Sequence, residues 1–439
     1  MNLEKDKSQE NFENISGDKI VDKTVIGVSV NILILGFTSL FTDLSSEMLI
    51  IVFPLYLLSL GISTVILGLI EGIGEATANI VKGFSGWLSD KIGRRKPIIL
   101  AGYALSNVTK PLIGVTRNWE PILLLKFSDR FGKGIRTSPR DSLISHWRPK
   151  KTGRAFGVHR AMDTTGAILA PFLVFLLLFL SLSYSDIIIL SIFPGIIAII
   201  VLLFVKDVKL PKKTIETNKI TKDFVKLLFI LGIMEFAAVN VAFLIIRAGD
   251  FFPGNPIIQF IKGFAANFGL GSLMPSFTLI PLIYGLLNII YAISAIYSGR
   301  LSDKIGRKKV IIWGLITLLT VCIGLSLPIK ASEMSILLIT LFFGLYGLYK
   351  GLVDPVSRAF VADFAGKEKR GSAYGLYYLI IGLTCIPETY LFGYIYEYFS
   401  ASSAFIYASS ILIISIILFS IYAPKLPNTK IKSKNAKIN

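Results

Sequence analysis

A seven-residue sequence that occurs twice constrains the fold of this chain more than any other feature. It reads Leu-Ser-Asp-Lys-Ile-Gly-Arg at residues 88–94 and again at residues 301–307, each time between two long apolar runs. Ser-Gly precedes both copies, and further basic residues follow both. An identical heptapeptide about half a chain away predicts an internal repeat, so that the chain consists of two related halves.

The apolar runs are long enough to cross a membrane. Of the 439 residues, 53% are hydrophobic and only 17% are charged. A membrane-spanning helix needs about 20 predominantly apolar residues, so the chain has room for about twelve such helices joined by short loops. The sequence therefore predicts an all-α, multi-pass membrane protein that is surrounded by the lipid bilayer.

Polar segments divide this predicted array of helices. We expect an N-terminal tail at residues 1–25 and a first helix bundle at 26–205. A Lys-rich linker at 206–223 leads to a second bundle at 224–422 and a C-terminal tail at 423–439. Residues 249–274 predict an outer loop with an interfacial segment near 256–268. Lys and Arg collect on the side of the tails, the linker and both heptapeptides. By the positive-inside rule, both termini are cytoplasmic and the protein lies in the cell membrane. The basic residues behind the net charge of +18 are placed as membrane-orientation signals, so we expect no nucleic-acid partner.

The residues around both heptapeptides match a known signature. The pattern G-x-x-x-D-K-x-G-R-[RK] at 86–95 and 299–308 resembles the signature loop of the major facilitator superfamily, which follows helices 2 and 8. This resemblance covers about residues 25–425 and implies two pseudo-symmetric six-helix bundles that transport by alternating access. Glycine permits close helix approach before each loop and a turn with positive φ within it. The gating residues that the resemblance implies are Gly86, Asp90, Gly93, Arg94, Gly299, Asp303, Gly306 and Arg307.

Ionisable residues inside the predicted spans mark the candidate site. Each costs about 2.5–3.5 kcal/mol at the helix centre, so such residues usually face a cavity or a partner. Two acidic pairs in the first half have four-residue spacing, which puts each pair on one helix face. Five basic residues in the predicted span at about residues 120–145, at positions 126, 130, 133, 136 and 140, share one stripe that must line the interior. The candidate substrate and coupling residues are Asp43, Glu47, Glu71, Glu75, Arg130, Lys133, Arg136, Glu235, Lys350 and Asp354.

Two interpretations of these charges stay open. The four acids of the first half bind coupling protons, because burial favours the protonated form of a carboxyl group, or they form static pairs with Arg130 and Lys133. The basic stripe binds an anionic substrate, because arginine suits carboxylate and phosphate, or it only neutralises the acids. Arg130-x-x-x-Gly134 resembles the helix 4 motif of proton-coupled members of the superfamily, although Lys133 stands where glutamine is usual.

The sequence thus predicts a proton-coupled secondary transporter of a small molecule. It has no ATP-binding loop of the G-x-x-x-x-G-K-[ST] type. Efflux of a hydrophobic or cationic compound in exchange for protons fits the acids, and transport of an organic or inorganic anion fits the basic stripe. A non-transporting membrane sensor ranks lower. Two cysteines in apolar runs and two histidines do not suggest a metal cluster, and no nucleophile–base pattern is present. We expect a monomer with no enzymatic activity, no metal and no cofactor.

Overall fold

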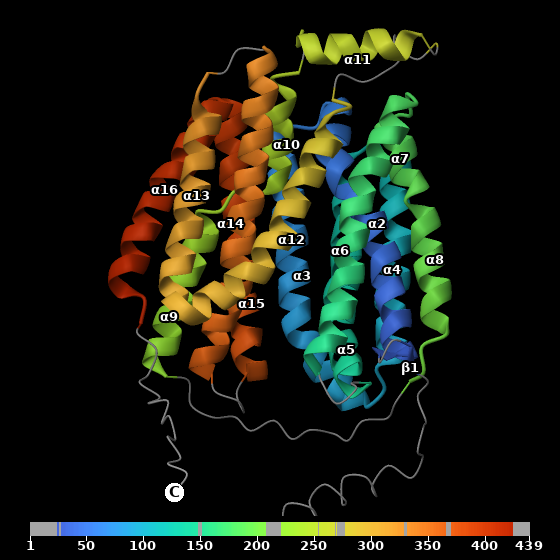
Figure 1. The fold of residues 1–439 in the computed structure, drawn as a ribbon, viewed down its shortest axis with the longest axis vertical. Coiled ribbons are helices and arrows are strands. Elements are labelled where there is room, and N and C mark those ends of the chain that lie inside the picture. The colour runs from blue at the N-terminus through green and yellow to red at the C-terminus, as the bar shows by residue number, and fades with distance from the viewer. Residues whose placement is uncertain are drawn as a thin grey trace, which may run out of the picture.

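Long helices run side by side in two groups, as the computed structural model shows (Figure 1). The structure describes residues 24–25, 28–147, 152–207, 221–252, 254–267, 269, 277–328, 332–365 and 370–424. Most of both predicted tails, most of the predicted linker and part of the predicted outer loop lie outside the described residues. The prediction of an all-α membrane protein is confirmed, with one addition at the N-terminal side. Two short strands, β1 (Thr24–Val25) and β2 (Val28–Ser29), form an antiparallel hairpin.

The first group contains the helices of the first half of the chain. They are α2 (Val30–Ser59), α3 (Thr64–Ile92), α4 (Lys96–Val115), α5 (Trp119–His146), α6 (Thr152–Phe179), α7 (Tyr184–Leu190) and α8 (Ile192–Leu203). Helices α7 and α8 are separated by Ser191 alone and together form one apolar span. The Ser45 hydroxyl of α2 donates to the Ser191 carbonyl oxygen at 2.8 Å, which satisfies the backbone at the break.

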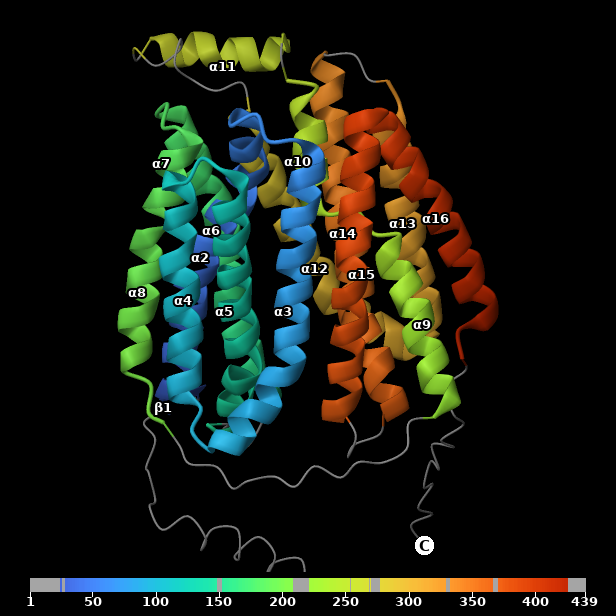
Figure 2. The same ribbon diagram turned by 180° about the vertical axis from the view of Figure 1, so that it is seen from behind.

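The second group contains the helices of the second half. They are α9 (Lys222–Phe236), α10 (Val241–Gly249), α11 (Pro256–Ala266), α12 (Ile280–Ile305), α13 (Arg307–Ser326), α14 (Glu333–Ala365), α15 (Arg370–Tyr398) and α16 (Ala401–Tyr422). Helices α9 and α10 form one span that is broken at residues 237–240. Helix α11 lies crosswise over one end of the molecule, within the predicted outer loop (Figures 1 and 2).

Eleven segments of the described chain are long and apolar enough to cross a membrane. Helix α5 has 28 residues but is not among them, because its charges make its sequence too polar. It nevertheless packs against α3 and α4 and runs with the other spans (Figure 2). The charged stripe of α5 therefore lies against other helices, and the array accommodates the expected twelve spans when α5 is included.

The two groups meet chiefly along two helix pairs, α3 with α15 and α6 with α12. Glycine lets the first pair approach closely. A Cβ atom at Gly68 would collide with the carbonyl oxygen of Thr389, and one at Gly393 would collide with that of Thr64. In the second pair, a Cβ atom at Gly285 would lie 3.1 Å from Pro171. These contacts fix how the two groups sit against each other.

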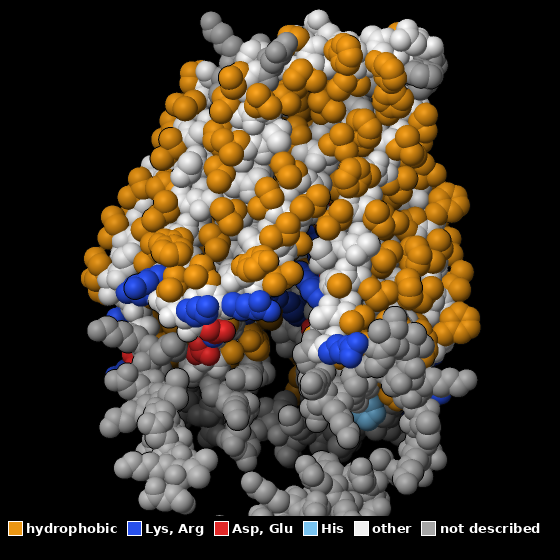
Figure 3. All heavy atoms as spheres, in the orientation of Figure 1, with side chains coloured by type: hydrophobic (Ala, Val, Ile, Leu, Met, Phe, Trp, Pro, Cys, Tyr) orange, Lys and Arg blue, Asp and Glu red, His pale blue; other side chains and the backbone are white. Residues whose placement is uncertain are grey.

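We call the end at which α3 leads to α4 and α12 leads to α13 the charged end. There the surface is hollowed between the two groups, and Lys and Arg side chains lie beside the hollow (Figure 3). At the opposite end the groups are in contact. The backbone N–H and the hydroxyl of Thr64 donate to the Glu397 carboxylate at 2.8 and 2.6 Å. This conformation is closed at the α11 end and open at the charged end.

The signature loops form the helix ends of the charged end. Gly93 and Gly306 have φ values of 74° and 95°, which confirms the prediction of turns with positive φ. The expected close approach is wrong for Gly299, because nothing lies within 4 Å of a Cβ atom placed there in this conformation. Arg307 pairs with Asp303 at 2.6 Å and with Asp363 of α14 at 3.0 Å. The second loop is thereby tied to its own half.

Candidate functional site

A cavity of about 360 Å³ lies between the two groups of helices. Its walls come from α2, α3 and α5 of the first half and from α9, α10, α12, α14 and α15 of the second. Among the described residues, α6 contributes no side chain to this lining. Lys133 lines the cavity and is exposed, so the cavity is not sealed there.

The break between α9 and α10 forms part of the cavity wall. Irregular backbone is tolerated at membrane depth only where it is buried in protein or lines a cavity, because each unsatisfied polar group is costly in hydrocarbon. Here the Tyr346 hydroxyl donates to the Val239 carbonyl oxygen at 2.7 Å. The Glu388 carboxyl group lies next to the backbone of Asn240. The break therefore places backbone and side-chain polar groups in the middle of a span, facing the cavity.

Two acids of the first half are paired with the basic stripe of α5. Lys126 donates to Glu71 at 2.8 Å, and its ammonium lies 4.0 Å from the centre of the Phe53 ring. Lys126 is completely buried and the Glu71 side chain is only 8% exposed. Arg130 lies 3.3 Å from Glu75. Glu71 and Glu75 thus have the static partners that one of our two interpretations assigned to the acids, with Lys126 in place of Lys133 as the partner of Glu71.

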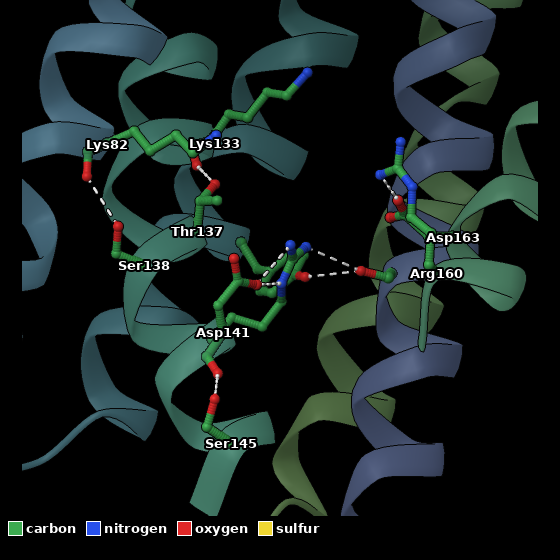
Figure 4. Close-up of polar contacts among 11 residues, drawn as sticks. Lys82, Lys133, Thr137, Ser138, Asp141, Ser145, Arg160 and Asp163 are labelled. Carbon is green, nitrogen blue, oxygen red and sulfur yellow. Dashed lines mark hydrogen bonds and ion pairs between the residues drawn. The ribbon is translucent and has the colours of Figure 1, made fainter. Parts of the chain in front are cut away.

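The other acidic pair of the first half is divided between two places. Glu47 lines the cavity and accepts a hydrogen bond of 2.7 Å from the Tyr284 hydroxyl of α12. Asp43 does not belong to the cavity lining. It lies instead near Asp163 of α6, whose carboxylate acts electrostatically on it. Asp163 also pairs with Arg160 at 2.6 Å (Figure 4).

The basic stripe of α5 divides in the same way. Lys133 extends away from Asp141 (Figure 4) and forms no ion pair within the described part of the chain. Arg136 is buried and lies 4.3 Å from the centre of the Tyr103 ring, away from the cavity. Arg140 pairs with Asp141 at 3.1 Å. Of the predicted site residues in the first half, Asp43 and Arg136 therefore lie inside the helix bundle and not at the cavity.

The second half contributes an acidic wall. Glu235, Lys350, Asp354 and Glu388 all line the cavity, and none of them forms an ion pair with a described residue. The Cys385 thiol lies 3.9 Å from Glu235, as a weak donor to its Oε1 atom. Glu388 is 6% exposed, and its Oε1 atom is buried without a hydrogen-bond partner among the described residues. Acids outnumber bases on this side of the cavity.

Several lining residues were not among our candidates. Tyr284, Tyr291 and Tyr346 all line the cavity. Lys110 of α4 was overlooked, although it is completely buried and donates to the Ser46 hydroxyl at 3.0 Å. Its place inside an apolar run was the signal that could have found it. Among the described residues, no group of His, Cys, Asp and Glu could hold a metal ion.

Comparison with known sequences places this arrangement in a family. The family model of the Major Facilitator Superfamily matches residues 35–285 and 255–438. An uncharacterized MFS-type transporter of Methanocaldococcus jannaschii is 35% identical over 402 residues, which cover 89% of this chain and 94% of that protein. The quinolone resistance protein NorA of Staphylococcus aureus is 29% identical over 141 residues, 32% of this chain and 36% of that protein.

Solved structures share the fold. A mutant form of the nucleoside transporter NupG is similar with a TM-score of 0.73 and 14% identity, over 89% of this chain and 99% of that chain. A bacterial homologue of the human lysosomal transporter Spinster, solved in an inward-facing and occupied conformation, gives a TM-score of 0.63 at 14% identity, over 89% and 94% of the two chains. Sequence, fold and a cavity between two helix bundles agree, and the chain belongs to the Major Facilitator Superfamily of membrane transporters.

Proposed function

We propose that this transporter is a secondary active, proton-driven exporter that moves a small organic molecule through the central cavity by alternating access. The observation that carries the proposal is the cavity itself, which lies between the two bundles and is lined by charged residues of both. Charged residues at membrane depth are expensive, so they mark a pathway for substrate or protons. The partial similarity to a quinolone resistance protein supports export as the direction.

Orientation follows from the distribution of basic residues. Lys and Arg collect at the charged end and in the segments that adjoin it, which the positive-inside rule assigns to the cytoplasm. Both termini are then cytoplasmic, and the protein lies in the cell membrane. The conformation described here is open toward the cytoplasm and closed toward the outside. A substrate would enter the cavity from the cytoplasm in this state.

Glu47 is our first choice for the proton-binding residue. It lies on α2 of one bundle, and its partner Tyr284 lies on α12 of the other. A hydrogen bond to an ionised carboxylate is roughly twice as strong as a neutral one, so protonation of Glu47 would weaken this contact between the bundles. Proton binding would thus change the relative stability of the closed and open states. Glu71 and Glu75, which have basic partners, would instead keep the charge of α5 balanced.

Transport in reconstituted vesicles tests the proposal. Purified protein would be placed in liposomes loaded with the fluorescent cation ethidium, and a pH gradient would be imposed across the membrane. We expect gradient-dependent movement of ethidium that Glu47→Gln abolishes. The control variant Glu120→Gln, which changes an exposed acid at the start of α5, should transport like the wild type. Movement that is independent of the gradient, or unaffected by Glu47→Gln, would overturn proton coupling through this residue.

A further inference from the structure

We propose that Glu388 and Glu235 form a subsite that binds a protonated amine, so that the transported molecules are organic cations. This inference rests on the proposed function and gives that transporter a substrate class. Glu388 comes from α15, and Glu235 comes from the last turn of α9, just before the break. Both side chains line the same cavity, with Cys385 on the same wall.

The first argument is an unmet hydrogen-bonding need. Oε1 of Glu388 is buried and has no hydrogen-bond partner among the described residues. A buried acceptor without a donor is costly, and native structures keep few of them. The cavity that Glu388 lines is the place from which a ligand could supply the donor. An ammonium group carries three donors and no acceptor, so it suits this position.

The second argument is the charge balance of the walls. In the first half, Glu71 and Glu75 already have Lys126 and Arg130 as partners. In the second half, Lys350 faces three acids. The excess of carboxylates therefore lies on the wall formed by α9, α14 and α15. An ion pair with a ligand cation would balance this wall, whereas an anion there would be repelled.

The remaining walls suit the body of an amine. Tyr284, Tyr291 and Tyr346 bring aromatic rings to the lining, and Ile50 and Leu287 bring apolar surface. Aromatic faces attract cations as well as apolar groups. A volume of about 360 Å³ lies in the range of ligand pockets for drug-sized molecules, which is about 300–1,000 Å³. The geometry fits a compact molecule with one protonated amine and an aromatic or aliphatic body.

The rival ligand is an organic anion held by Lys133. This residue lines the opposite wall and forms no ion pair within the described chain. Its ammonium acts electrostatically on Glu47 and Glu75, so acids of its own bundle already offset its charge. Lys350 offsets Glu388 only in part, because the same ammonium also acts on Glu235 and Asp354, and Glu235 adds a like charge. We therefore place the charged group of the substrate at the wall of α9 and α15.

Three matched probes test the inference by calorimetric binding to the purified full-length protein in detergent. They are 1-naphthylmethylamine, the neutral 1-naphthalenemethanol and the anion 1-naphthoate, each corrected for binding to empty micelles. We expect the amine to bind at least about tenfold more tightly than the other two probes. Glu388→Gln and Glu235→Gln should each weaken amine binding by at least about tenfold, because each removes a charge-assisted hydrogen bond. Glu120→Gln should leave it unchanged.

The outcomes separate this inference from the proposed function. Tighter binding of 1-naphthoate, or amine binding that neither glutamine variant weakens, would overturn the amine subsite while leaving proton-driven transport intact. Amine binding that depends on Glu388, together with ethidium movement in liposomes that does not respond to the pH gradient, would overturn proton coupling and leave the subsite intact. Thermal unfolding of both glutamine variants, each of which keeps the shape and one hydrogen-bonding oxygen of the original side chain, checks that they fold.

Discussion

Replacing Lys126 by methionine should destabilise the protein, and a second replacement should restore it. Lys126 is completely buried, and its ammonium lies 2.8 Å from a Glu71 side chain that is only 8% exposed. Removing one partner of a buried ion pair leaves an unpaired buried charge and costs about 3–5 kcal/mol. Loss of the cation above the Phe53 ring, at 4.0 Å, adds about 0.5–2 kcal/mol. Methionine keeps most of the apolar stem, so little of the cost comes from packing.

The double variant Lys126→Met, Glu71→Gln removes the orphaned charge together with its partner. Replacing both members of a buried pair is often close to neutral, so we expect the double variant to be more stable than Lys126→Met alone. The assay is the free energy of unfolding by chemical denaturation in mixed micelles, measured for both single variants, the double variant and the wild type. If the two single effects simply add in the double variant, the two side chains do not form the pair described here.

Two further substitutions, with a third as a control, test how the bundles fit together. Glu397→Ala removes the acceptor of the Thr64 backbone N–H at the closed end, so hydrogen–deuterium exchange in the first turn of α3 should become faster. Unchanged exchange would mean that this contact does not hold the end closed. Gly68→Ala should lower the free energy of unfolding by about 1–3 kcal/mol, because its methyl group would collide with a carbonyl oxygen of α15. Gly299→Ala, which meets nothing within 4 Å, should instead raise stability by up to about 1 kcal/mol through helix propensity. Equal effects of the two alanines in thermal unfolding would contradict the described α3–α15 contact.

The sequence was sufficient to predict the spans and the family, because length, apolar composition and a duplicated motif are local properties. It did not predict the breaks within two spans. Residues 237–240 contain neither Gly nor Pro, and the Val239 carbonyl oxygen accepts a hydrogen bond from Tyr346 of α14, which lies more than a hundred residues away along the chain. Pro194 at the start of α8 was a local signal for the other break. A break that depends on distant partners leaves little trace in its own sequence.

The candidate site shows the same division between local and tertiary information. Helical spacing correctly puts side chains on one face, but it does not tell which neighbour that face meets. Lys133 and Arg136 share a stripe, yet one lines the cavity and the other lies against the Tyr103 ring. Asp43 and Glu47 are four residues apart, yet one faces α6 and the other α12. Partners of buried charges follow from helix packing, which the spacing alone does not contain.

The most direct test of alternating access is the distance between labels across each end of the molecule. Spin labels would be attached to pairs of cysteines at exposed positions, in a background without the native cysteines. The pair at the α11 end is Ser59→Cys with Ser400→Cys, and the pair at the charged end is Lys91→Cys with Lys304→Cys. Double electron–electron resonance would record both distances in lipid nanodiscs from about pH 8 to about pH 5. We predict that the two distances change in opposite directions, one end opening as the other closes. Distances that both stay fixed, or that change in the same direction, would contradict proton-driven alternating access.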